Sequence, residues 1–132
     1  MNALELARTA YTSPASPTRT ERGAEYETIA RVTGELRQAT QDRQRNFKRF
    51  VAALHRNRRL WTILAANVAD KDNALPRELR AKLFYLAEFT LKQTQDILAK
   101  RGEPDILVEI NTAVLHGLRS GEAPPIPTGP RA

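Results

Sequence analysis

The sequence contains no cysteine. That absence excludes a disulfide framework, a zinc site built on thiolates and a cysteine nucleophile. It also suits a protein that works in a reducing compartment, so we expect a cytoplasmic location. The chain has 132 residues, which is enough for one domain with one modest core.

Long apolar runs are missing as well. No stretch approaches the roughly eighteen consecutive apolar residues that a membrane-spanning helix needs. The N-terminus lacks the order of basic, apolar and small residues that marks a signal peptide. We therefore expect no membrane insertion and no export by the general route.

Familiar catalytic motifs are also absent from the sequence. It has no glycine-rich phosphate loop, no nucleophile elbow and no recognisable pair of catalytic carboxylates. Neither His55 nor His116 has an acidic or histidine neighbour three or four positions later, and catalytic zinc needs three protein ligands. The polar turn 70–73 begins like a calcium loop, but Ala74 and Leu75 stand where an oxygen ligand and a glycine are needed. We expect no enzymatic activity, no metal and no cofactor.

Positive charge is what the sequence has in excess, because its formal net charge is +6. The segment 43–59 accounts for all of that excess, since it holds seven basic residues and no acid. The other 14 of the 21 basic residues are balanced by 15 acids. The seven are Arg43, Arg45, Lys48, Arg49, Arg56, Arg58 and Arg59.

The spacing of apolar residues predicts helices and nothing else. No alternating strand pattern or Asn-Gly hairpin signal occurs. The fold class we predict is all-α, a compact antiparallel bundle of about five helices forming a single domain over 1–119. Residues 120–132 hold four prolines and two glycines, and we expect them to form a disordered tail. The predicted helices cover about 2–11, 18–40, 45–69, 76–100 (ended by Gly102) and 103–119.

The basic segment 43–59 admits three interpretations. On a helical wheel with Phe47 at 0°, most of its basic side chains fall at about 100° to 200°, opposite an apolar stripe that begins at Phe47 and includes Trp61. A solvated face is the simplest interpretation, an acidic protein partner the second and a nucleic acid the third. Because no aromatic residues are interleaved on the basic side to stack with bases, we do not expect nucleic-acid binding. An RNA-binding regulator acting through 43–59 is the alternative function.

Two polar residues interrupt the apolar stripe of the third predicted helix. Arg58 falls at about 20° on the wheel, which places it within the stripe. It either pairs with a buried acid or carbonyl, or marks an interaction surface. For Asn57, the residue beside it, a structural role and a functional role are equally plausible interpretations. Trp61 is most simply a core residue.

The third and fourth predicted helices carry more apolar surface than five short helices would cover. Such a surplus favours a groove that accepts a visiting helix. We expect the partner-binding surface on these two helices. The candidate partner-binding residues are Asn57, Arg58, Trp61, Leu64, Phe84 and Phe89.

An ordered series of short motifs runs along nearly the whole chain, up to about residue 119. The series is specific although no single motif has a catalytic logic, and the chain resembles the flagellar biosynthesis regulator FlaF family. The motifs are Asn2-Ala3-Leu4, Ala10-Tyr11, Thr20-Glu21-Arg22, Glu25-Tyr26, Asn57-Arg58-Arg59-Leu60-Trp61-Thr62-Ile63-Leu64, the residues 70–73 with Leu75-Pro76, Leu79-Arg80-Ala81-Lys82-Leu83, Glu88-Phe89-Thr90 and Asp105-Ile106-Leu107-Val108-Glu109-Ile110-Asn111-Thr112-Ala113.

This resemblance implies a cytoplasmic helical protein of flagellum assembly that supports flagellin synthesis and export. Proteins similar to FlaF act alongside the flagellin-synthesis repressor FlbT, and direct contact with FlbT is left open. The implied partner is flagellin, whose unassembled ends are amphipathic helices with exposed apolar faces. A helical groove in a chaperone or adaptor would mask such faces.

Overall fold

A computed structural model of the chain describes residues 16–120, with side chains from 26 to 117. These residues form four helices and no strand. The all-α prediction is therefore confirmed, and the number of helices is one fewer than the predicted number of about five. The helix expected over 2–11 and the tail from residue 121 onward lie outside the described residues. The helices are α2 (Ser16–Gln41), α3 (Phe47–Ala69), α4 (Arg77–Leu98) and α5 (Asp105–Ser120).

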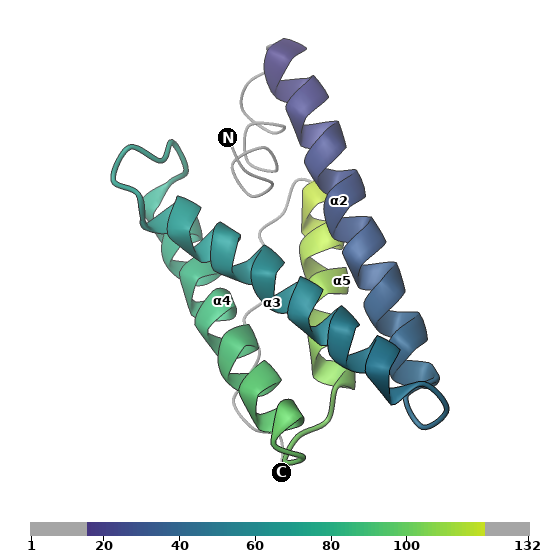
Figure 1. The fold of residues 1–132 in the computed structure, drawn as a ribbon. Helices are drawn as coiled ribbons and strands as arrows, with labels where there is room; N and C mark the ends of the chain where they lie inside the picture. The colour runs from purple at the N-terminus through teal and green to yellow at the C-terminus, as the bar shows by residue number, and fades with distance from the viewer. Residues whose placement is uncertain (1–15, 121–132) are drawn as a thin grey trace.

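The helices form a bundle in which α2 and α5 run side by side in opposite directions (Figure 1). α3 passes obliquely across the front of α5 in this view, and α4 returns beside α3. The connections cover only 42–46, 70–76 and 99–104. Connections this short oblige consecutive helices to reverse direction. None of the described helices is both long and apolar enough to cross a membrane.

Side-chain hydrogen bonds set both ends of α3. The side chain of Asn46 accepts a hydrogen bond of 3.1 Å from the backbone N–H of Arg49, so Asn46 is the N-cap. At the other end the guanidinium of Arg80 donates to the carbonyl oxygens of Val68 and Asp70, at 3.1 and 3.0 Å. These bonds satisfy carbonyls that a helix end leaves without partners, and they tie the first turns of α4 to the end of α3.

The C-terminal end of α4 is followed by a lysine in a backbone conformation that glycine usually adopts. The N–H of Lys100 donates to the carbonyl of Ile97 at 2.9 Å, and the N–H of Arg101 donates to that of Asp96 at 2.8 Å. This pair of bonds is a Schellman motif, which requires a left-handed residue that is usually glycine. Here Lys100 takes that conformation, with φ of 62°. The expectation that Gly102 ends this helix is therefore wrong, because the helix ends at Leu98 and the reversal occurs at Lys100.

The core formed by residues 26–117 consists of two apolar clusters, one at each end of the bundle. The upper cluster is centred on Trp61 and lies toward the α3–α4 connection, and the lower cluster is centred on Leu54 and lies toward the α2–α3 connection. The upper cluster contains Ile29, Trp61, Leu64, Val68, Leu75, Leu83, Leu86, Ala87, Ile110 and Val114. The lower cluster contains Leu36, Ala39, Phe50, Ala53, Leu54, Ile97 and Leu107.

Replacing Lys100 with glycine should stabilise the protein. A side chain in the left-handed region strains the backbone, so Lys100→Gly should raise the free energy of unfolding by about 0.5 to 1 kcal/mol. Lys100→Ala is the matched control, because it removes the charge but keeps the Cβ atom and should gain nothing. Denaturant unfolding of both variants measures the difference, and equal stabilities would contradict this account of the helix end.

Candidate functional site

A layer of buried polar side chains separates the two apolar clusters. Each helix contributes to it: Thr33 from α2, Asn57 from α3, Thr90 from α4 and Asn111 from α5, none more than 1% exposed. On α3, for example, Asn57 lies between a lower-cluster leucine and the upper-cluster Trp61. Buried polar groups are costly unless they are hydrogen-bonded. The layer therefore needs a definite arrangement of partners.

Asn111 is the centre of that arrangement. Its side-chain N–H group donates to Asn57 Oδ1 at 2.7 Å and to Thr33 Oγ1 at 3.1 Å. Its carbonyl oxygen accepts from Trp61 Nε1 at 2.9 Å. Thr33 in turn donates to the carbonyl of Ile29 at 2.7 Å. One amide thus fixes α5 against both α2 and α3.

Three of the predicted partner-binding residues belong to this interior. Asn57, Trp61 and Leu64 are only 0%, 1% and 3% exposed, respectively. The structure joins the first two through Asn111 and places Leu64 with Trp61 in the upper cluster. The hydrogen bond that Asn57 accepts from Asn111 is made within the protein, and a partner contact at Asn57, Trp61 or Leu64 stays a prediction.

The two predicted phenylalanines on α4 lie nearer the surface. Phe84 is 37% exposed. Phe89 is half-buried, packs against the upper cluster and lies 6.3 Å from the ring of Tyr85, measured between ring centroids. Both can still be reached from outside at least in part, so a partner contact at Phe84 or Phe89 stays a prediction.

Arg58 does not point into the core. Its side chain is half-exposed, and its guanidinium lies 2.6 Å from Nδ1 of His55 on the same helix. The helical wheel misplaced it because the wheel was anchored on Phe47, which is 58% exposed and is not a core residue. The mean direction of the buried residues of α3 lies about 90° away from Arg58 on the wheel. A contact between Arg58 and a partner stays a prediction, but a buried ion pair is excluded.

Several side chains of the basic segment are already engaged within the molecule. Arg49 donates to both carboxylate oxygens of Glu35, at 3.0 and 3.3 Å, and Arg56 lies 4.0 Å from the same carboxylate. Arg45 pairs with Asp42 at 2.9 Å. The exposed side chains of Lys48 and Arg59 form no ion pair with any described residue. The segment is therefore largely the outer face of an amphipathic helix.

The ion pair between Glu35 and Arg49 joins α2 to α3 at the surface. The hydrogen bond from Arg49 lowers the pKa of Glu35 below its ordinary value of 4.5, against the opposite effect of burial, and the charges of Arg49 and Arg56 lower it further. Both side chains of the pair remain about one-third exposed. An exposed pair of this kind contributes little to stability, because the solvent screens the attraction between its charges.

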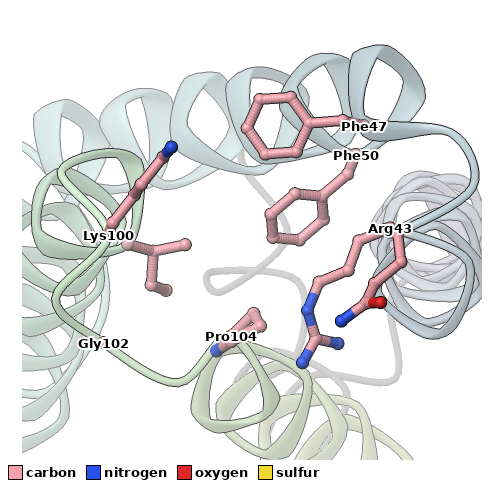
Figure 2. A pocket seen from close by; sticks show the side chains of 8 residues that line it. Arg43, Phe47, Phe50, Lys100, Gly102 and Pro104 are labelled. Carbon is pink, nitrogen blue, oxygen red and sulfur yellow. The ribbon is translucent and has the colours of Figure 1, made fainter.

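A pocket of about 440 Å³ opens at the lower end of the bundle, where the α2–α3 and α4–α5 connections meet. Phe47, Phe50, Ile97 and Pro104 give it an apolar lining, and Phe47 is the most exposed large apolar side chain described. Figure 2 shows the two phenylalanine rings between Lys100 and Arg43. Its size is within the range of pockets that hold a side chain or a small ligand. The lining residues are Arg43, Gln44, Phe47, Phe50, Ile97, Lys100, Gly102 and Pro104.

Sequence reasoning missed this pocket. It treated Phe47 as part of the core stripe and Lys100 as the last residue of a regular helix. A signal for the first was available, since Phe47 directly follows the Asn46 cap and so has no preceding helical turn beneath it. The placement of Lys100 beside it depends on how three helices meet, which periodicity does not reveal.

Groups of three or more histidine or acidic side chains arranged to hold a metal ion do not occur among residues 26–117. The pocket instead combines two aromatic rings with two cationic side chains. The chemistry such a site offers is noncovalent recognition of an apolar group beside a negative charge.

Comparison with known proteins places the chain in a family. The model of the family described as flagellar protein FlaF matches residues 7–118 of the chain. No curated protein and no solved structure matches it.

Removing the amide of Asn111 should strongly destabilise the fold. Asn111→Ala leaves the buried Trp61 Nε1 and Asn57 Oδ1 without the partner described for each, and it opens a cavity. We expect a loss on the order of 3 kcal/mol in the free energy of unfolding. Thr112→Ala is the control. Thr112 is the next residue along α5, its hydroxyl is exposed, and its loss should cost little stability. Denaturant unfolding that places both variants within about 0.5 kcal/mol of each other would refute the role given to Asn111.

The Glu35–Arg49 pair should make stability depend on pH in the acid range. Because the pKa of Glu35 is lowered in the folded protein, its contribution is present above the unfolded-state pKa and is lost as pH falls through the folded-state pKa. Glu35→Gln should therefore unfold more easily than the wild type at pH 7, by less than about 1 kcal/mol. The difference should shrink as pH falls below 4.5. Thermal unfolding from pH 7 to pH 3 would contradict this if the difference stayed constant.

Proposed function

The chain belongs to the flagellar protein FlaF family, and from that membership we propose that it supports flagellin synthesis and export by binding flagellin helices. It acts as a chaperone or adaptor and not as an enzyme. The observation that carries the proposal is the family match over residues 7–118, which includes all of α2, α3 and α4 and nearly all of α5.

The surface of the molecule supports a binding role. Among residues 26–117, four large apolar side chains are at least 37% exposed, namely Phe47, Ile63, Phe84 and Tyr85. Exposed apolar groups on helices are the usual means of holding the apolar face of a second helix. A chaperone of this kind would cover faces of flagellin that otherwise join subunits together, and so would delay polymerisation until export.

The cytoplasm is where such binding would be needed, because flagellin is made there before export. The repressor FlbT is a second partner that this function could accommodate, on a surface that flagellin leaves free. Neither partner requires a cofactor.

Titration of the full chain with monomeric flagellin tests the proposal. We expect heat of binding with a negative heat-capacity change, because apolar surface is buried. Raising the salt from 50 to 200 mM should weaken binding by less than about tenfold, since few ion pairs are involved.

The alternative, regulation through the flagellin transcript, predicts the reverse pattern. Transcript RNA would bind, and its affinity would fall by orders of magnitude over the same salt range if many phosphates were contacted. A chain that binds this RNA and gives no heat with flagellin would refute the chaperone proposal.

A further inference from the structure

The pocket at the lower end of the bundle has an incompletely covered apolar lining. Phe47 and Phe50 lie 6.0 Å apart between ring centroids, yet they differ greatly in exposure, at 58% and 4%. Phe50 belongs to the lower cluster, whereas the described residues leave most of Phe47 uncovered. The pair therefore extends the core outward to a surface that a further apolar group could cover.

The charges around this pocket have one sign. Among the described residues, its lining includes Arg43 and Lys100 and no acidic residue. Arg43 is half-buried and donates to the carbonyl of Thr40 at 2.7 Å, which holds its guanidinium at the end of α2. Lys100 is exposed and forms no ion pair with any described residue. An occupant with a carboxylate beside its apolar group would complement this pocket.

The backbone of Lys100 gives a second, independent reason to assign a role to its side chain. Glycine would hold the left-handed conformation of this residue without strain, but the chain has a lysine there with φ of 62°. Strained backbone positions tend to occur where a side chain has a function. In Figure 2 the amino group of Lys100 extends along the side of the pocket opposite Arg43.

We propose that this pocket receives an amphipathic helix of the partner, with one large apolar side chain against Phe47 and Phe50. An acidic residue three or four positions away on that helix pairs with Lys100 and faces Arg43. This spacing places two side chains on the same face of a helix. The inference rests on the proposed function and names the part of the surface that performs it.

A protein helix fits the pocket better than a nucleic acid does. Nucleic-acid binding needs a row of cations that follows many phosphates, and only two cationic side chains of the part of the chain that the structure describes line this pocket. Ile97 and Pro104 complete its apolar lining. A single apolar side chain with one neighbouring carboxylate uses every feature of the site.

Calorimetric titration of full-length variants with monomeric flagellin tests the inference. Phe47→Ala should weaken binding by about tenfold or more, because it removes the exposed ring that covers the guest side chain. Lys100→Ala and Lys100→Gly should each weaken it about three- to tenfold. Lys100→Gly should do so while its melting temperature rises, so lost affinity in this variant does not arise from unfolding.

Three control variants define the site. Ile63→Ala removes an apolar side chain that is 50% exposed on the same helix, about 24 Å further along it. Phe84→Ala removes an exposed ring of α4, and Lys71→Glu changes the net charge in the distant α3–α4 connection. Ile63→Ala and Phe84→Ala should weaken flagellin binding less than Phe47→Ala does, and Lys71→Glu should bind flagellin as the wild type does.

The outcomes separate the two proposals. If the wild type binds flagellin, but the variants at Phe47 and Lys100 bind equally well, this inference is overturned and the proposed function stands. The same holds if affinity falls in Phe84→Ala or Ile63→Ala and not in Phe47→Ala. If the wild type binds no flagellin, the proposed function itself fails.

Discussion

The hydrogen bonds of the Asn111 side chain are the constraint on which the rest of the structure depends. An amide buried in an apolar core loses its bonds to water, so it is tolerated only where protein partners replace them. Asn57, Trp61 and Thr33 do so at distances of 2.7, 2.9 and 3.1 Å. Sliding α5 along α2 or α3 would break these bonds together. The layer therefore selects one register among the many that apolar clusters alone would permit.

The register set in the middle of the bundle determines what lies at its ends. The pocket is assembled from the start of α3, the end of α4 and the connection into α5, so its shape follows from how these three meet. The layer itself is not fully satisfied, since Asn57 Nδ2 and Thr90 Oγ1 are buried without a described hydrogen-bond partner. Such groups cost stability. The polar layer thus gives up some stability but specifies a single arrangement of the helices. That arrangement fixes the positions of the helices that carry the exposed aromatic side chains.

Much of this fold was predictable from the sequence, because helix periodicity and end signals are local. The helices predicted over 45–69 and 103–119 match α3 and α5 to within two residues. Trp61 was correctly interpreted as core. The direction of the core was harder, because a wheel anchored on one wrong residue, Phe47, turned Arg58 inward by mistake. A residue at the first position of a helix is a poor anchor, since the neighbouring turn that would cover it is absent.

The features that escaped prediction are those that depend on tertiary packing. No local signal marks Asn111 as the partner of Asn57, because the two are 54 residues apart in the chain. Nor does the sequence indicate that Lys100 adopts a left-handed conformation where Gly102, two positions later, seemed the natural residue to end α4. The pocket depends on contacts between residues far apart in the chain and on the backbone conformation of Lys100. Neither is visible in the sequence, so sequence reasoning places the candidate site on the middle of α3 and α4 and not at their ends.

Hydrogen exchange of the full chain, measured with and without monomeric flagellin, tests the central claim most directly. The account predicts that flagellin slows exchange chiefly in two segments, 43–50 and 97–106, which border the pocket. Slowed exchange confined to the surface around Ile63 or Phe84, with these two segments unchanged, would contradict it.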